Sequence, residues 1–281
     1  MSRLSVKKTY KLYIAGKFPR TESGRSYPVT GKRDAFLANA CRASRKDLRN
    51  AVVAAHKAQP GWAAASAYLR AQILYRLAEM LEGRSAAFAD ELNQQGLTPK
   101  QAAAEVAEAV DLLVYYAGWA DKYAQLASTV NPVASPHFNF SRPEPTGVIG
   151  LVAPQDRQPL LGLIGGLAPI LAAGNAVIAL AHEASPLSAM SFAEVVNDSD
   201  VPGGVVNILT GSPAELREPF ATHLDLNGLA WFGADAETRK TVGEGASLSV
   251  KRIQFYDTVA EDLDRVTAFT ETKTTWHPVG A

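Results

Sequence analysis

Short apolar segments alternate with segments of helical periodicity over the second half of the chain, and this alternation constrains the fold more than any other feature. Four apolar runs of strand length lie at residues 148–152, 176–180, 205–209 and 229–232, and a fifth strand is predicted at the mixed segment 251–255. Helical patterns separate them at residues 160–171, 187–196, 213–223 and 235–242. Strands that alternate with helices at this short spacing predict an α/β fold with a doubly wound, mostly parallel sheet.

The first half of the chain predicts a hairpin followed by several helices. The hairpin is expected over residues 10–29, with turns at Ala15-Gly16 and Ser23-Gly24. Asp47 is expected to cap a helix that ends near residue 58, just before Pro60. Further helices are predicted at residues 68–81, 85–92 and 99–126. Residues 129–145 contain four prolines and an alternating piece at 137–141, which predicts an extended, partly exposed strand.

Composition excludes some classes of partner. The 281 residues carry 28 Lys and Arg and 28 Asp and Glu, so the formal net charge is zero and predicts neither nucleic acid nor an anionic membrane as partner. The one cysteine, Cys41, cannot form an internal disulfide, which fits a reducing cytoplasm. The longest apolar stretch, residues 160–180, is interrupted by Pro169 and Asn175, and the first residues lack the apolar core of a signal peptide. We therefore expect a cytoplasmic protein without a membrane span.

Two short sequence motifs within the predicted sheet are specific enough to indicate a family. Residues 171–175 read Leu-Ala-Ala-Gly-Asn, and residues 202–211 read Pro-Gly-Gly-Val-Val-Asn-Ile-Leu-Thr-Gly. With the words at 12–17 and 145–150, they make residues 10–256 resemble the N-terminal half of the aldehyde dehydrogenase superfamily. The resemblance implies a Rossmann-like cofactor domain that carries an oligomerisation hairpin.

The tail adds a second point of resemblance. Residues 269–274 read Phe-Thr-Glu-Thr-Lys-Thr, which resembles the last, oligomer-forming strand of full-length family members. This implies an internal deletion in which the catalytic domain is absent and the terminal strand is kept; an unrelated polar tail is the alternative. The expected parts are an N-terminal helical part (1–128), an oligomerisation strand region (129–146), a Rossmann-like core (147–258), and a connector with a C-terminal association strand (259–281).

The residues that carry out the family's catalytic chemistry are missing from this sequence. Family members use a cysteine thiolate to attack the aldehyde carbon. Cys41 lies far upstream of the matching position and is expected to be a buried, inert thiol. The family's oxyanion-binding asparagine has no counterpart, because residues 154–159 read Pro-Gln-Asp-Arg-Gln-Pro, and Asp156 would repel a developing oxyanion. We therefore predict no catalytic residue.

The positions that hold the nicotinamide cofactor in the family are degenerate. Its ribose-binding lysine is replaced by Leu180, which cannot hydrogen-bond a sugar hydroxyl, although Glu183 remains. At the pyrophosphate position, Ala234 lacks the family's hydroxyl group. Asp235 is expected to cap the following helix and so to satisfy the amides that a phosphate would use. We expect no cofactor, with binding of NAD as the alternative.

No other candidate group in the sequence is expected to act in catalysis or in metal binding. Tyr256 aligns with the family's general base, but an ordinary tyrosine is a poor base at neutral pH. Its neighbour Asp257 has no nucleophile to activate. The five histidines show no metal-binding spacing, so we predict no metal.

Two functions remain open. In the first, the chain is a non-catalytic subunit, a pseudoenzyme, that pairs with a full-length NAD(P)-dependent aldehyde dehydrogenase or with itself, like the degenerate unit of two-module family members. Its expected interface comprises strand residues before and after the core: Phe138, Phe140, Phe269, Thr270, Thr272, Thr274 and Trp276. In the second, it is a residual NAD(P)-dependent oxidoreductase acting on aldehydes. A small-molecule sensor that uses the emptied cleft has no supporting motif.

Overall fold

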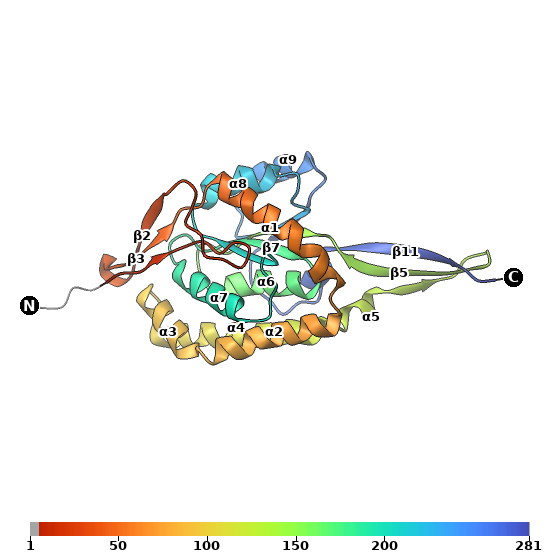
Figure 1. Ribbon diagram of the computed structural model, residues 1–281, viewed down its shortest axis with the longest axis horizontal. Helices are drawn as coiled ribbons and strands as arrows, with labels where there is room; N and C mark the ends of the chain where they lie inside the picture. Colours follow the sequence, from red (N-terminus) through yellow and green to blue (C-terminus); the bar gives the residue numbers. More distant parts are fainter. Residues whose placement is uncertain (1–5, 281) are drawn as a thin grey trace, which may run out of the picture.

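A five-stranded parallel sheet forms the centre of the protein, whose computed structural model describes residues 6–280 (Figure 1). The strand order is β10-β9-β6-β7-β8. The strands are β6 (Val148–Val152), β7 (Ala176–Leu180), β8 (Val206–Leu209), β9 (Gly228–Phe232) and β10 (Arg252–Tyr256). Every neighbouring pair runs parallel. The predicted α/β fold with a doubly wound parallel sheet is confirmed.

Helices cover both faces of this sheet, because both faces of its strands are apolar. In β6, Val148 and Val152 belong to one buried cluster, and Ile149 and Leu151 belong to the other. The helices on the first face are α1 (Arg45–Ala64), α8 (Pro213–Thr222) and α9 (Ala236–Ser247), and those on the second are α6 (Leu161–Ala172) and α7 (Leu187–Asp198). Burial on both faces explains why the strands read as continuous apolar runs.

A second layer of helices lies outside α6 and α7 (Figure 1). It consists of α2 (Ala67–Glu82), α3 (Ser85–Gln94) and α4 (Pro99–Trp119). The sequence predicts one helix to residue 126, but α4 ends at Trp119 and α5 (Tyr123–Ala127) follows after a turn. The turn lets the buried Tyr123 reach the end of α6, where its hydroxyl donates to the Ala173 carbonyl oxygen at 3.4 Å.

The longest apolar stretch of the sequence is divided between two elements of the core. No helix among residues 6–280 is long and apolar enough to cross a lipid bilayer. Instead, the chain leaves α6, turns at Gly174 and enters β7. Asn175 fixes this turn, since its side-chain oxygen accepts from the Gly147 amide at 2.8 Å and its nitrogen donates to the Phe269 carbonyl at 2.9 Å.

The prediction of a hairpin over residues 10–29 is wrong. A three-stranded sheet forms instead, from β1 (Thr9–Tyr10), β2 (Ser26–Thr30) and β3 (Phe36–Cys41), with the short 3-10 helix η1 (Lys32–Asp34) before β3. Ile14 and Lys17 do form a tight turn, but the Tyr13 amide donates to the Ile208 carbonyl at 2.9 Å. This segment therefore covers the β8 edge of the central sheet, which a free hairpin would leave open.

The first long helix also differs from the prediction at both ends. Ser44 caps α1, and Asp47 completes a capping box by accepting from the Ser44 amide at 2.7 Å. The helix continues through Pro60 to Ala64. Trp62 lies in this extension and is buried, and its indole nitrogen donates to the Leu171 carbonyl at 3.1 Å. Both the burial and the hydrogen bond favour the longer helix.

The remaining strands form an arm that extends from the body and carries the C-terminus near its tip (Figure 1). Its antiparallel sheet has the order β11-β5-β4, from β4 (Thr129–Asn131), β5 (His137–Pro145) and β11 (Thr270–Pro278). A short helix, α10 (Asp264–Thr267), leads into β11. The strand predicted at 137–141 and the terminal strand predicted at 269–276 are thus neighbours, although well over a hundred residues separate them.

Candidate functional site

In an open parallel sheet, the ligand crevice lies at the carboxyl ends of the strands where the strand order reverses. Here that point lies between β6 and β9, since the chain proceeds from β6 toward β8 on one side and from β9 toward β10 on the other. The loop after β6 and the turn after β9 flank this point, which is called the crevice below. The degenerate positions noted in the sequence lie in these segments, at the ends of the adjacent strands, or, for Glu183, in the loop after β7.

Gln155 closes the gap between the ends of β6 and β7. Its side-chain nitrogen donates to the Ala153 carbonyl at 2.7 Å and lies 3.4 Å from that of Ala181. Its side-chain oxygen accepts from the Glu183 amide at 2.8 Å. The two loops are thereby joined by protein hydrogen bonds. This role was not predictable from the sequence, because Gln155 stands beside the position of the expected oxyanion donor without matching it.

A buried carboxylate occupies the N-terminus of the helix that follows β6. Glu105 reaches across from α4 and accepts from the amides of Leu160 and Leu161, at 2.8 and 3.2 Å. Only 5% of the residue is exposed, and burial raises the pKa of its carboxyl group above the ordinary value. The carboxyl group of Glu105 therefore already occupies the amides at the α6 N-terminus. The detectable signal was an acidic residue on the apolar stripe of α4, between Ala102 and Ala109.

Leu180 and Glu183 lie as the sequence suggested, at the end of β7 and in the loop after it. Leu180 is fully buried in the core beneath α1 and presents no polar group. The Glu183 carboxylate lies 3.6 Å from the Arg42 guanidinium, and the Tyr27 hydroxyl donates to the Glu183 carbonyl at 3.0 Å. Contacts from the N-terminal sheet thus hold this loop.

The turn after β9 begins a capped helix. Asp235 is the N-cap of α9 and accepts from the Thr238 amide at 2.7 Å, as the sequence predicts. This hydrogen bond lowers the pKa of the Asp235 carboxyl group. Ala234 is almost fully buried, and its carbonyl accepts from the Arg239 side chain at 3.0 Å. The negative charge of this carboxylate disfavours a second anion at the start of α9.

Tyr256 packs among side chains at the end of β10. Its ring lies 5.2 Å from that of Phe232, and the Arg265 guanidinium lies over it at 4.4 Å. Burial raises the pKa of the Tyr256 hydroxyl to about 12, so it stays protonated at neutral pH and cannot act as a base. The neighbouring Asp257 pairs with Arg239 at 2.9 Å.

The connector after β10 crosses the body beside α6. Gly165 on α6 permits this passage, because a Cβ there would lie 2.5 Å from a methyl carbon of Val259. The Tyr116 hydroxyl donates to the Ala260 carbonyl at 2.9 Å, and Arg265 donates to the Thr258 carbonyl at 2.6 Å. The connector is therefore a packed element, docked on α4 and α6.

The thiol of Cys41 and the imidazole of His182 are both buried. Cys41 ends β3 and is buried, as predicted, with its carbonyl accepting from the Thr210 hydroxyl at 2.5 Å. Burial lowers the pKa of His182, whose ring nitrogen accepts from the Ser185 amide at 3.1 Å. Between residues 6 and 280, no three His, Cys, Asp or Glu side chains are grouped so as to hold a metal ion.

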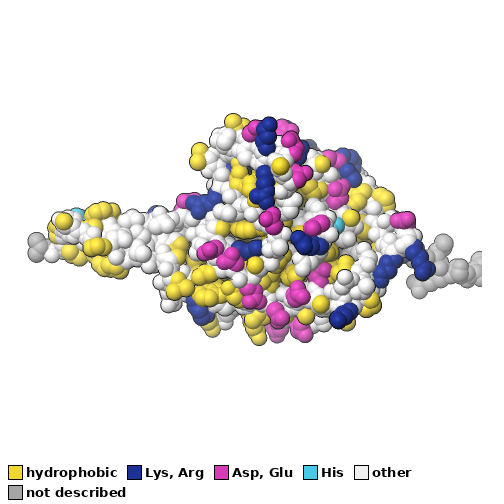
Figure 2. All heavy atoms as spheres, turned by 180° about the vertical axis from the view of Figure 1, so that it is seen from behind, with side chains coloured by type: hydrophobic (Ala, Val, Ile, Leu, Met, Phe, Trp, Pro, Cys, Tyr) yellow, Lys and Arg dark blue, Asp and Glu magenta, His cyan; other side chains and the backbone are white. Residues whose placement is uncertain are grey.

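The predicted interface residues divide into two groups. Phe138, Trp276 and the row from Thr272 to Thr274 lie exposed on the arm, and Phe140 is half-buried beside Phe138. Thr274 also shares a hydrogen bond of 2.8 Å with Ser141 across the two strands. Hydrophobic side chains gather on this arm, as Figure 2 shows.

Phe269 and Thr270 were wrongly placed in that interface. Phe269 is 1% exposed, and its ring fills the space beside Gly228 on β9. Thr270 is also buried, and its hydroxyl donates to the Thr267 carbonyl at 2.9 Å. The start of β11 therefore belongs to the core, and only the part beyond Thr270 is free to meet another chain.

Comparisons with known proteins agree with this fold. The sequence matches the profile of the family described as the aldehyde dehydrogenase family over residues 21–256. It is 31% identical over 253 residues to DhaS of Bacillus subtilis (strain 168), a protein named among the aldehyde dehydrogenases, covering 87% of this chain and 50% of DhaS. It is 30% identical over 251 residues to omega-crystallin of Enteroctopus dofleini, covering 86% of this chain and 49% of that protein.

Solved structures extend the likeness to three dimensions. PnpE from Pseudomonas sp. WBC-3 superimposes with a TM-score of 0.83 at 29% identity, covering 88% of this chain and 50% of PnpE. The NAD⁺ complex of an aldehyde dehydrogenase from Bacillus cereus superimposes with a TM-score of 0.83 at 26% identity, with the same coverage of 88% and 50%. The chain thus spans about half the length of these relatives, and it belongs to the aldehyde dehydrogenase family.

Proposed function

We propose that this protein is a non-catalytic member of the aldehyde dehydrogenase family that associates, as a structural or regulatory subunit, with a full-length NAD(P)-dependent aldehyde dehydrogenase. One observation carries the proposal. At the starts of α6 and α9, side chains of this chain accept from backbone amides: Glu105 accepts from those of Leu160 and Leu161, and Asp235 accepts from that of Thr238. These amides are the groups that would bind a dinucleotide phosphate.

The residues at the crevice do not fit a nicotinamide cofactor. A phosphate would have to displace two carboxylates, one of them buried, or remain beside their negative charge. Leu180 offers the ribose no hydrogen bond, and Gln155 uses its amide group to join the two loops. We therefore derive no reaction step through NAD(P).

Thiol chemistry is equally unsupported in these 281 residues. Cys41, the one cysteine, lies 3% exposed at the end of a strand in the N-terminal sheet. It sits beside Thr210 near the end of β8, two strands from β6 along the sheet. A nucleophile must reach the substrate carbon and have a base beside it, and Cys41 meets neither condition.

The arm supports the association half of the proposal. β11 lies at one edge of the sheet, and an edge strand presents amide and carbonyl groups to another chain. Beyond Thr270 the strand pairs with β5, where Lys273 forms an ion pair with Glu144 at 2.8 Å, and its first residue, Glu271, also pairs with Arg252 of β10 at 2.8 Å. Large side chains remain exposed on the arm, with Phe138 of β5 at 46% and Trp276 of β11 at 57%. Aromatic side chains of this kind often anchor protein interfaces.

Co-production with a full-length aldehyde dehydrogenase of the same organism tests this function. We expect the two chains to co-purify and to give an intact-complex mass that contains both. The double substitution Phe138→Ser and Trp276→Ser removes exposed aromatic area from the arm and should weaken the association about tenfold or more.

A matched control removes apolar area elsewhere. Val53→Ser and Tyr75→Ser lie on α1 and α2 with similar exposure, 64% and 58%, and should leave the complex mass unchanged. If the full-length enzyme never co-purifies, or if this protein forms only complexes with itself, the proposed partner is wrong. If both double variants weaken the complex equally, the arm is not the interface.

A further inference from the structure

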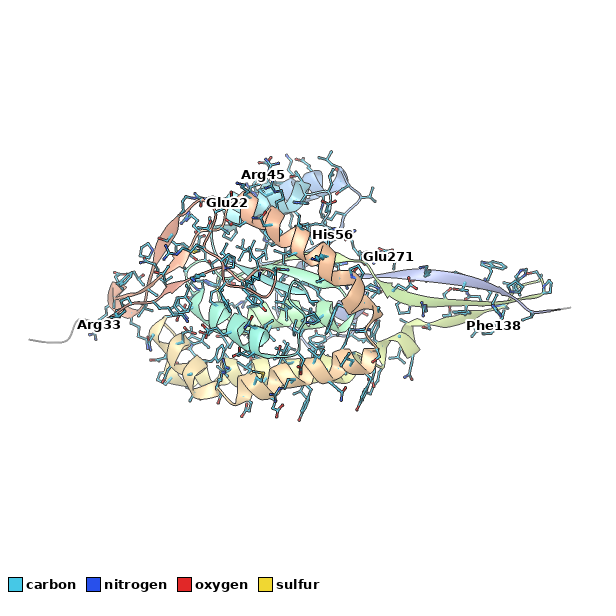
Figure 3. All side chains as sticks on the ribbon, in the orientation of Figure 1. Glu22, Arg33, Arg45, His56, Phe138 and Glu271 are labelled. Atoms are coloured by element: carbon cyan, nitrogen blue, oxygen red, sulfur yellow. The ribbon has the colours of Figure 1, made fainter. Side chains whose placement is uncertain are left out.

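A pocket on the opposite side of the sheet from α6 brings several basic side chains together. It lies between α1 and α8, has a volume of about 540 Å³, and is here called the α1–α8 pocket. It is lined by Arg45, Lys46, Arg49, Pro219, Thr222, His223, Leu224 and Asp225. Figure 3 shows Arg45 on the α8 side of α1, in line along that helix with His56. None of these residues belongs to the crevice described above.

The two arginines of the pocket have no carboxylate partner. Lys46 forms an ion pair with Glu22. Among residues 6–280, no carboxylate oxygen lies within 4.0 Å of the side-chain nitrogens of Arg45 or Arg49. Asp225 is the one acidic residue of the lining. The pocket therefore keeps a local excess of positive charge in a chain whose net charge is zero.

This arrangement works against the stability of α1. Arg45 lies in the first turn, where the helix dipole disfavours a cation. Arg49 lies one turn later on the same face, and like charges at this spacing repel one another. The two arginines lower the stability of this helix, and no ion pair offsets that cost. Charges placed in this way indicate a function other than stabilising the helix.

We propose that the α1–α8 pocket binds a small phosphate-bearing anion. A guanidinium group presents paired donors that match phosphate oxygens, and two such groups one helical turn apart can hold two phosphate groups or one from two sides. Pro219 and Leu224 give the pocket an apolar wall for the remainder of the ligand. The volume falls in the range of about 300–1,000 Å³ typical of small-molecule sites.

The electrostatics of the adjoining residues agree with an anion site. Burial lowers the pKa of the His223 imidazole, Asp225 opposes this, and the positive charges of Lys251 and Arg45 lower it further. The Lys251 ammonium group is close at hand, donating to the His223 carbonyl at 2.8 Å. An anion in the pocket would be attracted by the positive charges of Arg45 and Lys251 and repelled by the single negative charge of Asp225. This proposal stands on α1 and α8 and does not depend on the proposed partner or on the closed crevice.

Calorimetric titration with inorganic pyrophosphate at low ionic strength tests the proposal. The wild-type protein should bind with a stoichiometry of one. The double substitution Arg45→Gln and Arg49→Gln should weaken this binding about tenfold or more, because each guanidinium supplies charge-assisted hydrogen bonds. Lys57→Gln with Lys100→Gln removes the same charge from exposed helical positions and should leave the affinity within about twofold.

Thermal melting separates loss of the site from loss of the fold. Without ligand, the Arg45→Gln and Arg49→Gln variant should melt at a temperature no lower than wild type, because an unfavourable pair of charges is gone. Pyrophosphate should raise the melting temperature of wild type and not of this variant. The proposal is overturned if wild type does not bind pyrophosphate, if both double variants lose affinity equally, or if only acidic polypeptides such as polyglutamate bind.

Discussion

Two carboxylates occupy the helix starts at the crevice, and they do so under different physical conditions. Asp235 is exposed, and the hydrogen bond from the Thr238 amide lowers the pKa of its carboxyl group, so it is ionised at neutral pH. Glu105 accepts from two amides, but burial outweighs these bonds and raises the pKa of its carboxyl group. The ionised form of Glu105 is therefore less favourable in the folded protein than in water, which gives stability a measurable dependence on pH.

Glu105→Gln should reveal this dependence. Because the pKa of Glu105 is raised in the folded state, its contribution to stability is fully present below the unfolded pKa of about 4.5 and is lost as the pH rises through the folded pKa. Glutamine keeps one acceptor oxygen for the α6 amides and does not titrate. Urea unfolding from pH 4 to pH 7 should show the stability of wild type relative to this variant falling by about 1 kcal/mol or more.

Asp111→Asn supplies the control, since it removes an exposed carboxylate further along the same helix. A difference between wild type and Glu105→Gln that does not change with pH, or that grows as the pH rises, would contradict a buried carboxylate at the α6 N-terminus.

At the scale of elements, the two ends of β11 have different roles, and the boundary between them lies just after Thr270. Its start is part of the core, where Phe269 packs on β9 and the Phe269 carbonyl accepts from Asn175 and from the Thr146 amide. The remainder, from Glu271 onward, is exposed and pairs with β5. Figure 3 places Glu271 where the arm meets the body. Stability and association should therefore depend on different parts of this strand.

Two truncations separate these roles. Removal of residues 271–281 keeps Phe269 and should leave the body folded, while association through the arm weakens. Removal of residues 268–281 also deletes the buried ring and should lower the free energy of unfolding by about a further 3–5 kcal/mol, as expected for a large core side chain.

Chemical denaturation of the two truncated proteins measures the difference. Phe269→Ala in the full-length chain provides a point of comparison, since it removes the ring and retains the strand. Equal stability of the two truncations would show that Phe269 does not pack in the core as described.

At the scale of the whole molecule, the central sheet could be predicted almost completely from the sequence. The apolar runs at 148–152 and 176–180 coincide with β6 and β7, because strands buried on both faces must be continuously apolar. The Asp235 cap was also predictable, since an N-cap is set by residues within one turn. Features that depend on local chemistry were thus accessible.

Features that depend on distant contacts were not accessible in the same way. β3 reads as an unremarkable mixed segment, and it becomes a strand only between β1 and β2. Glu105 lies 55 residues before the amide that it caps, so no local pattern links them. Phe269 looks like the first residue of an exposed strand, and only the fold places it beside Gly228.

We propose that the crevice of this family member no longer accepts a dinucleotide. Titration calorimetry of the purified chain with NAD⁺ and NADP⁺ tests it directly, with a full-length aldehyde dehydrogenase titrated alongside as the positive control. We predict no saturable heat up to about 1 mM cofactor, which corresponds to a binding free energy weaker than about 4 kcal/mol. Saturable binding of either cofactor in the micromolar range would contradict the account.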